Sequence, residues 1–285
     1  MARYREIQKR ILGIKKTQKI TRAMKLVSAA KFSRAQNAIV AARPYAQKLS
    51  EVLASVASGV DLDAHALITP RATVKKLDVV VFTSDRGLCG AYNTNIAKFA
   101  ERLIVKRRPE VESISIIAVG RKGGDTLKAR RVAPIEQRWA ATSRAQSALA
   151  GEVAELLTER YLTGKADETI LVYSEFVSAL TQRPGVQQLL PLRPPASASA
   201  GPVYQIEPDA EQLLATLVPR AVEFSIFRAL LENQAGEHGA RMTAMESATS
   251  NTTELIRSYT LEFNKARQAA ITAELVEIVS GAEAL

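Results

Sequence analysis

The sequence predicts an α/β protein: a long antiparallel coiled coil of N- and C-terminal helices plus a central Rossmann-like α/β domain. Three observations support this fold class. Residues 3 to 58 contain one proline and one glycine, and residues 208 to 285 read as a second long helix interrupted strongly only by Pro219. Between them, short β-branched runs alternate with helical stretches. The predicted boundaries are 1–60 and 208–285 for the helices, 74–195 for the α/β domain and 196–207 for a loop.

The N-terminal segment predicts one very long helix, bent near Pro44 because proline removes a backbone hydrogen bond inside a helix. Apolar and small residues recur at spacings of three and four, which places them on one face of the helix. They are Tyr4, Ile7, Ile11, Ile14, Phe32, Ala35, Ile39, Ala42, Ala46 and Leu49.

The C-terminal segment predicts a helix that begins near Pro208, with acidic residues in its first turn. Steps of three and four form a heptad seam with small and hydroxylated members: Met242, Met245, Thr249, Thr252, Ile256, Tyr259, Phe263, Ala266, Ala270 and Ala273. This helix is longer than its N-terminal partner by about 20 residues, so we expect its apolar end to project and to enter a socket on another protein.

The central segment predicts a parallel sheet with crossover helices. The expected strands are Leu77–Thr83, Ser113–Val119 and Glu168–Phe176, and a further strand is expected at Gln187–Leu192. The expected helices cover about 91–107, 121–129 and 143–163. The Pro/Ala/Ser-rich residues 191 to 202 predict a loop that returns the chain to the last helix.

The stretch SDRGLCGAYN (84–93) follows a predicted buried strand, where many α/β proteins bind a phosphate. It matches neither the Walker loop nor the dinucleotide fingerprint, since its glycines are Gly87 and Gly90. Cys89 is the single cysteine and the chain has two histidines, so neither a zinc set nor a nucleophile with its base is indicated. We therefore predict no catalytic, cofactor or metal residues and no enzymatic activity.

The net charge of +10 is concentrated in the first 34 residues, where eleven cations accompany the single acid Glu6. Such a segment favours an acidic partner, either nucleic acid, anionic lipid or an acidic protein surface, although a solvated helix face is an alternative. No apolar run approaches the length of a membrane helix, and the N-terminus has no signal-peptide pattern. With one cysteine, these features predict a cytoplasmic protein.

Three motifs resemble those of the γ subunit of F-type ATP synthases: QKITRAMKLVSAAKFSRAQ (18–36), SDRGLCGAYN (84–93) and ARQAAITAELVEIVSGA (266–282). The resemblance covers the whole chain. It implies a non-catalytic central-stalk rotor that couples proton-driven rotation of the c-ring to changes at the β-subunit catalytic sites. It also implies a hexamer of α and β subunits, the ε subunit and the c-ring as partners. The expected place is peripheral, at the cytoplasmic face of the bacterial inner membrane, with no cofactor, nucleic acid or membrane insertion.

The resemblance also suggests partner-binding residues. Residues at family positions that contact the β subunit and its sleeve are Met24, Arg241, Arg267, Gln268, Thr272 and Glu274. Tyr204 and Glu207 match the segment that meets the c-ring and ε, although Ile206 stands where the family more often has a second tyrosine. This chain also departs from the family at Gly236 and Gly239. These glycines predict a softer helix or the close approach of another backbone.

Two other functions compete with this one. The first is a basic coiled-coil protein that binds nucleic acid, but the basic helix contains only Tyr4 and Phe32 as interleaved aromatics and has no groove-reading motif. The second is an enzyme with a Rossmann-like nucleotide site, which the missing glycine fingerprint argues against.

Overall fold

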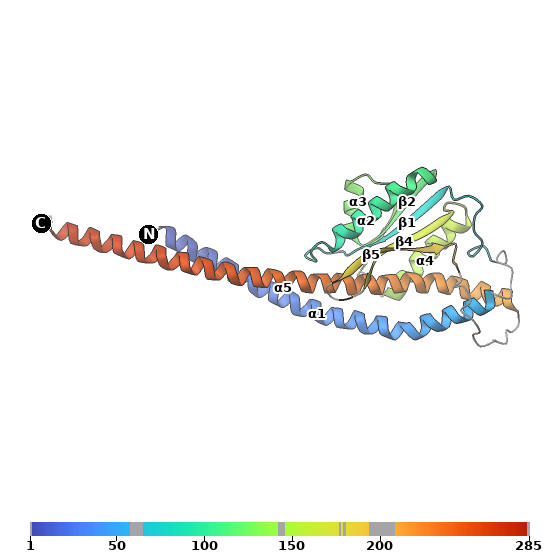
Figure 1. Ribbon diagram of the computed structural model, residues 1–285, viewed down its shortest axis with the longest axis horizontal. Helices are drawn as coiled ribbons and strands as arrows, with labels where there is room; N and C mark the ends of the chain where they lie inside the picture. The colour runs from blue at the N-terminus through green and yellow to red at the C-terminus, as the bar shows by residue number, and fades with distance from the viewer. Residues whose placement is uncertain are drawn as a thin grey trace. The chain divides into compact units, whose positions relative to one another are not determined.

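The computed structural model describes residues 2–57, 65–141, 146–176, 178, 181–193 and 209–283. The chain divides into two compact units, one of residues 1–28 with 241–285 and one of residues 29–240. Two helices, α1 (Ala2–Ala57) and α5 (Ala210–Glu283), contribute to both units (Figure 1). Both helices are continuous, α1 through Pro44 and α5 through Pro219.

The larger unit is built on a five-stranded sheet in the order β3-β2-β1-β4-β5. All neighbouring strands pair in parallel except β4 and β5, which are antiparallel. The central strands read as nearly continuous apolar runs because both faces of the sheet are covered. The strands are β1 (Lys76–Phe82), β2 (Ser113–Val119), β3 (Ile135–Trp139), β4 (Glu168–Phe176) and β5 (Gln182–Leu190).

Helices cover the two faces of this sheet in separate layers (Figure 1). One face carries α2 (Tyr92–Arg107), the short 3-10 helix η2 (Arg108–Glu110) and α3 (Arg121–Ala129). The other face carries α4 (Gln146–Leu162) and parts of α1 and α5.

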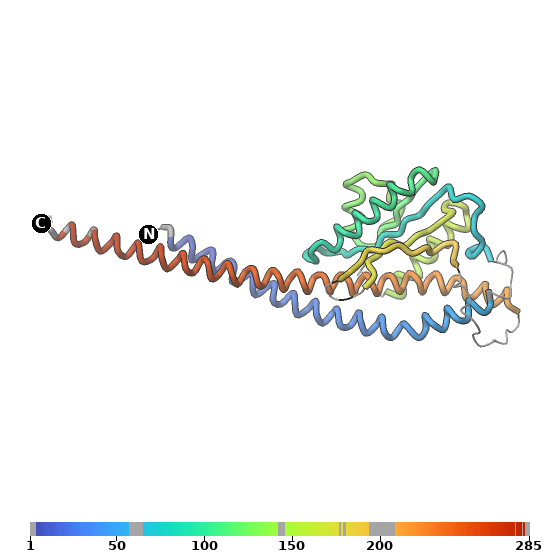
Figure 2. Tube along the Cα trace, in the orientation of Figure 1, coloured from blue at the N-terminus to red at the C-terminus, as the bar shows by residue number. Residues whose placement is uncertain are grey.

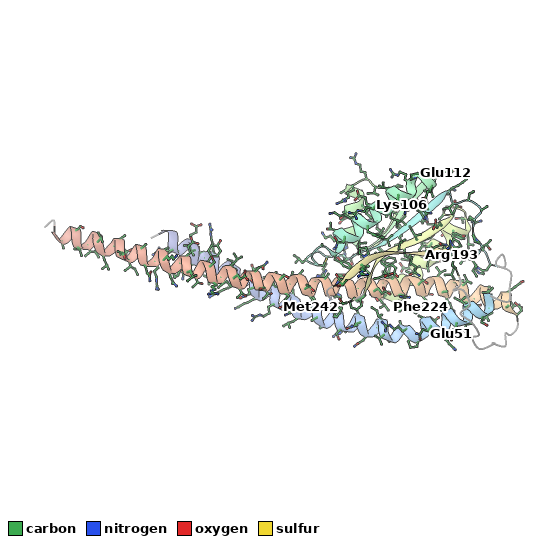
Figure 3. All side chains as sticks on the ribbon, in the orientation of Figure 1. Glu51, Lys106, Glu112, Arg193, Phe224 and Met242 are labelled. Carbon is green, nitrogen blue, oxygen red and sulfur yellow. The ribbon has the colours of Figure 1, made fainter. Side chains whose placement is uncertain are left out.

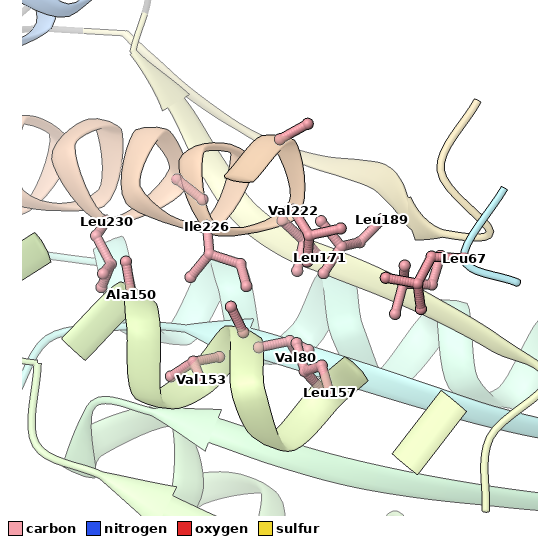
Figure 4. Packing of buried hydrophobic residues seen from close by; sticks show 14 of the residues in the cluster. Leu67, Val80, Ala150, Val153, Leu157, Leu171, Leu189, Val222, Ile226 and Leu230 are labelled. Atoms are coloured by element: carbon pink, nitrogen blue, oxygen red, sulfur yellow. The ribbon is translucent and has the colours of Figure 1, made fainter. Parts of the chain in front are cut away.

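Successive side chains of each strand point to opposite faces of the sheet, so each strand contributes to a hydrophobic cluster on both faces. In β1, Val79 and Val81 join the cluster under α2, whereas Val80 and Phe82 join the cluster under α4 and α5. Figure 4 shows Val80 and Leu171 of the sheet with side chains of α4 and α5. The segment of α5 within residues 210–240 is therefore a core element of the larger unit.

The predicted strands at 113–119 and 168–176 match the structure, and β1 differs from its prediction by one residue at each end. Two differences are informative. The strand β3 was not expected, and β5 begins at Gln182 and runs antiparallel, whereas the sequence predicted only a short strand from Gln187 in a parallel sheet.

In the smaller unit, the N-terminal part of α1 lies antiparallel to the C-terminal part of α5 (Figure 2). Tyr4 contacts Phe263 edge-on, with ring centroids 6.1 Å apart, and further along α1 the Gln18 amide donates to the Thr253 hydroxyl at 2.7 Å. Lys25 forms an ion pair with Glu246. Residue numbers therefore rise along α1 where they fall along α5, which is the antiparallel pairing predicted from two long helices at opposite ends of the chain.

Candidate interaction surfaces

The seam between the paired helices changes from apolar to polar along its length. Ile7 and Ile11 are buried near the N-terminal end of α1, but Thr21 and Ser28 occupy the buried positions further along the helix. Thr21 meets Thr249 with hydroxyl oxygens 2.8 Å apart. The Thr249 hydroxyl also donates to the Met245 carbonyl at 2.7 Å. Because the Thr249 hydroxyl donates its single proton to its own helix, it accepts the hydrogen bond across the seam from the Thr21 hydroxyl.

The outward face of α1 is basic. The exposed cations of this part of the helix are Arg5, Lys9, Arg10, Lys15, Lys16, Lys19 and Arg22. Among the described residues, the only ion pairs made by residues 2–28 are Arg10 with Glu6 and Lys25 with Glu246. Large apolar side chains are exposed between these cations, including Leu12 and Ile20. This surface therefore combines unpaired positive charge with apolar area, which suits an acidic protein surface.

The end of α5 continues past the start of α1, from Phe263 to Glu283 (Figure 2). The predicted seam residues remain partly buried as far as Ala270, whereas Ala273 is exposed. Beyond that point the apolar side chains of this tip are about half exposed or more: Ile271 49%, Leu275 57%, Val276 59%, Ile278 68% and Val279 55%. Exposed apolar area of this kind is typical of a surface that contacts another protein.

The residues expected to contact partners at the tip lie on its surface. Arg267, Gln268, Thr272 and Glu274 are exposed. The Arg267 guanidinium lies 6.0 Å from the ring centroid of Phe263, and the Thr272 hydroxyl donates to the Gln268 carbonyl at 3.0 Å. The structure thus presents four of the predicted residues together on one helix end.

The other predicted contact residues have different environments. Met24 is half-buried, next to the ion-paired Lys25. Arg241 is only 8% exposed, so within this chain most of its side chain is already covered. Tyr204 and Glu207 lie outside the described residues, and their assignment stays a prediction.

In open α/β sheets, ligands bind where the strand order reverses, at the carboxyl ends of the strands. Here that point lies beside β1, and the Asn233 side chain of α5 occupies it. Its amide donates to the carbonyl of Thr83, directly after β1, at 3.2 Å. Its carboxamide oxygen accepts from the Tyr92 hydroxyl at 2.8 Å, and the Asn233 carbonyl accepts from the same hydroxyl at 2.9 Å. A group of the chain's own helix therefore fills the crevice.

The N-terminus of α3, which would be the phosphate-binding end of such a helix, is also occupied. The Gly123 amide donates to the Thr83 hydroxyl at 2.9 Å, and the Lys122 amide donates to the Ser84 carbonyl at 3.1 Å. The Arg121 amide donates to the Asp85 carboxylate at 3.1 Å. These backbone donors are satisfied by the turn that follows β1, so SDRGLCGAYN acts here as a structural turn.

Cys89 in this turn is buried, and its sulfur accepts from the Asn93 amide at 3.2 Å. The same Asn93 amide donates to the Ser84 hydroxyl at 2.8 Å. The cysteine is thus packed and hydrogen-bonded as a small interior residue, as the sequence suggested.

Sequence reasoning missed the contact between Tyr92 and α5. A Cβ atom placed on Gly236 would lie 3.0 Å from the Tyr92 ring. The glycine therefore makes room for an aromatic side chain, not for another backbone as expected, while α5 continues through it as a helix. Tyr92 belongs to the SDRGLCGAYN motif, but nothing in that motif indicates which distant residue its hydroxyl bonds.

Two buried ionisable groups in the larger unit have structural partners. Arg160 makes a bidentate contact with Asp78, with nitrogen–oxygen distances of 2.6 and 2.9 Å. Burial raises the pKa of Asp78, and the Arg160 guanidinium opposes this shift. Burial and the nearby Glu232 carboxylate raise the pKa of Tyr173 to about 12. Both groups lie inside the fold, where they bear on stability.

Within the described ranges, no group of three or more His, Cys, Asp or Glu residues is placed to hold a metal ion. In the same part of the chain, the helices all fall short of the combined length and apolar content that a membrane span requires.

The whole chain matches a known protein family. The model of the ATP synthase family matches residues 3–285. An ATP synthase gamma chain of Trichlorobacter lovleyi is 46% identical, over 100% of this chain and 99% of that protein. One from Anaeromyxobacter sp. (strain Fw109-5) is 47% identical, over the full length of both.

The chain belongs to the ATP synthase gamma chain family. The predicted family and function are thereby confirmed, and none of these matches supports the nucleic-acid-binding alternative.

Solved structures agree on the fold. The rotor of the Euglena gracilis mitochondrial ATP synthase in rotational state 1 aligns with a TM-score of 0.67 at 23% identity, covering 94% of this chain and 98% of that one. A second Euglena structure, of OSCP, F1 and the c-ring in rotational state 3, gives a TM-score of 0.68 at 23% identity, covering 99% and 94%. The predicted fold class, with a Rossmann-like sheet and long terminal helices, is confirmed.

Proposed function

We propose that this chain is the rotating shaft of an ATP synthase, and that the nucleotide chemistry belongs to other subunits. In this proposal a hexamer of alternating α and β subunits surrounds the paired helices. The observation that best supports this proposal is the end of α5, which continues beyond Tyr4 of α1 as a helix with exposed apolar side chains. Such a tip needs a sleeve, and small or aliphatic side chains on a helix suit a bearing in which no single orientation is locked.

The basic face of α1 supports contact with acidic loops of the β subunits. Exposed pairs between long cationic side chains and carboxylates contribute only about 0–1 kcal/mol each. Contacts of this strength form and break easily, which a shaft requires when it presents the same surface to three β subunits in turn. Met24 lies on this part of α1, and we assign it to the surface that passes the β loops.

The polar residues of the α5 tip support a second set of contacts. We assign Arg267, Gln268, Thr272 and Glu274 to contacts with loops of the β subunit. We assign Arg241 to the same contacts, through the 8% of its surface that is exposed. Hydrogen bonds that involve a charged group contribute about 1.5–3 kcal/mol when shielded from water. Contacts made in one orientation and lost in the next would hold the three catalytic sites in different states.

The larger unit is proposed to stand on the membrane ring. Tyr204 and Glu207, which precede α5, are assigned to the c-ring and ε by family resemblance. Turning of the c-ring by proton flow would then turn this unit and the helices that leave it. The corresponding location is the cytoplasmic face of the bacterial inner membrane, as a peripheral subunit.

A non-catalytic role is supported by the two places where a Rossmann-like sheet usually binds its ligand. Asn233 fills the crevice beside β1, and side-chain and backbone groups after β1 satisfy the amides at the start of α3. A bound nucleotide would have to displace both sets of hydrogen bonds.

Co-expression of this chain with the α and β subunits of a relative tests the proposal. The three should co-purify as a complex that hydrolyses ATP, whereas the isolated chain should bind no ATP by calorimetry. Separate elution of this chain from a stable α/β complex would contradict the proposal.

A further inference from the structure

In the proposed shaft, torque leaves the larger unit through α1 or α5, since these are the described elements that contribute to both units. The larger unit holds the two helices in different ways. The way in which each helix is held decides which of them turns together with the sheet.

The middle of α1 is separated from the rest of the larger unit. A cavity of about 480 Å³ lies between residues 39–47 of α1 and the facing parts of β4 and α5. Phe32 of α1 contacts Phe176 with ring centroids 5.4 Å apart, and Tyr45 contacts Phe224 at 4.8 Å. Further along, α1 joins the apolar core through Leu49, Leu53 and Val56. These contacts are apolar, and apolar burial is non-directional, so they resist turning of the helix only weakly.

Hydrogen bonds to the sheet hold α5 in addition to apolar contacts. Its core side chains run from Leu214 to Leu230, and Asn233 follows them. The Asn233 amide donates to the Thr83 carbonyl, and both Asn233 oxygens accept from the Tyr92 hydroxyl. Thr83, Tyr92 and Asn233, called here the α5 clasp, are all buried. The clasp therefore joins α5 to the end of β1 and the start of α2 by directional bonds.

The α5 clasp is anchored in the centre of the sheet. The Thr83 amide donates to the Val119 carbonyl of β2 at 2.8 Å, and the Thr83 hydroxyl accepts from the Gly123 amide of α3 at 2.9 Å. A Cβ atom on Gly120 would clash with the Thr83 carbonyl, so the backbone is closely packed at this point. Thr83 is thereby fixed to β2 and α3, and Asn233 is fixed to them through Thr83.

We propose that Asn233 is the positioning residue that fixes the angle of α5 about its own axis, so that torque passes from the larger unit to the shaft through the α5 clasp. This inference rests on the proposed function, in which the larger unit turns with the c-ring. A turn of α5 by about 20° moves an atom about 5 Å from the helix axis by nearly 2 Å. Such a shift breaks the hydrogen bonds of the clasp, whereas the buried apolar area changes little.

The place of the clasp along α5 suits this role. The larger unit ends at Ala240, about two turns of helix beyond Asn233. Gly236 lies on this stretch and leaves the space that the Tyr92 ring occupies. A short length of helix twists less than a long one under the same torque, so a link at this end of the larger unit transmits rotation with little lag.

The test follows a bead on the larger unit while the α/β hexamer is fixed to a surface and holds the shaft. The bead is attached through Lys106→Cys, an exposed position of α2 on the far side of this unit from Phe224 of α5 (Figure 3). Tyr92→Phe keeps the ring and removes the hydroxyl. Loss of one buried hydrogen bond should raise the share of α5 in turned settings about fivefold. The angular spread of the bead at each pause should therefore widen, while the rate of ATP hydrolysis stays the same.

The matched control is Tyr161→Phe, which removes the hydroxyl of another buried tyrosine, one that donates to the Thr69 carbonyl at 2.9 Å. This variant should lose a similar amount of stability and keep the angular spread of the unaltered chain. Asn233→Leu also removes the bond to Thr83 and should widen the spread more than Tyr92→Phe does.

An unchanged spread in Tyr92→Phe would overturn the proposal. Equal widening in both tyrosine variants would overturn it as well, because it would show a general loss of rigidity. If the bead on the unaltered chain shows no directed rotation with ATP, the proposed function fails and this inference fails with it, which is a different result from either.

Discussion

The Thr21 and Thr249 hydroxyls meet across the paired helices at 2.8 Å, in the part of the seam where a coiled coil usually places leucine or isoleucine. Thr21→Val should lower the free energy of unfolding by about 1 kcal/mol, since it leaves Thr249 without its partner across the seam. The double change to valine should lower it by less than the sum of the two single changes, because either single change already removes the hydrogen bond across the seam. Urea denaturation followed by circular dichroism measures both.

The matched control for this pair is Thr17→Val on the same helix. The Thr17 hydroxyl is exposed and donates only to the Gly13 carbonyl, so its loss should change stability by less. Strictly additive losses in the double variant would show that the two threonines do not interact.

Gly236→Ala should destabilise the protein although alanine favours helices. Its Cβ would lie 3.0 Å from the ring of Tyr92, which is buried and held by its bonds to Asn233. In a Tyr92→Leu background the same change should become stabilising, by about 1 kcal/mol, because the ring no longer stands there. Gly13→Ala on α1, where nothing lies within 4 Å, should be stabilising in either background. A stabilising Gly236→Ala in the unaltered chain would contradict this account.

Tyr173→Phe should change how stability depends on alkaline pH. Folding raises the pKa of Tyr173 from 10.0 to about 12. The contribution of Tyr173 to the free energy of unfolding is therefore complete below pH 10 and is lost as the pH rises toward 12. Near neutral pH the variant should be about 1 kcal/mol less stable, since Gln187 loses the hydroxyl that lies 3.0 Å away. Above pH 10 the gap should close by about 1.4 kcal/mol per pH unit. Denaturation at a series of pH values checks this, and a constant gap would refute it.

Periodicity predicted the long helices and much of the sheet because it records which side of an element is buried. The seam from Met242 to Ala270 and the strand at 113–119 have this signal. The strand β3, with the sequence IEQRW, lies at the edge of the sheet and has polar residues between Ile135 and Trp139, so no apolar run identified it. The start of β5 contains Pro184 and Gly185, which usually indicate a turn.

The crevice beside β1 could not be predicted in the same way. Tyr92 and Asn233 are 141 positions apart, and their hydrogen bond depends on how α5 packs on the sheet. A single sequence carries no pattern for one side-chain contact between distant elements. Gly236 was a usable signal that something approaches the helix, but it did not identify an aromatic ring.

Met24→Lys should permit assembly with α and β but make ATP synthesis inefficient. The added cation beside Lys25 would form an ion pair with β carboxylates that must break at every step of rotation. Met24→Leu conserves volume and should synthesise ATP at the unaltered rate. Synthesis by reconstituted vesicles measures the difference. Failure of the lysine variant to assemble would instead mark Met24 as a packing residue of the seam.

Arg267→Ala/Gln268→Ala should reduce cooperative turnover more than assembly. Both side chains are exposed on α5, while Ile271, Leu275 and Ile278 remain to contact the sleeve. The rate of ATP hydrolysis is measured at limiting ATP, where one catalytic site is occupied, and at saturating ATP, where the three sites act cooperatively. Normal turnover at both ATP concentrations would show that these polar side chains face solvent and make no contact needed for cooperation.

Rotation of the chain inside the hexamer is the most direct test of its proposed role. A bead can be attached through Lys106→Cys on α2, because the native Cys89 is buried and will not compete for the label. With the α/β hexamer fixed to a surface through β, addition of ATP should turn the bead in one direction, in steps of a third of a turn. A complex that hydrolyses ATP at its normal rate while the bead shows only undirected motion would contradict the assignment of this chain as the rotor.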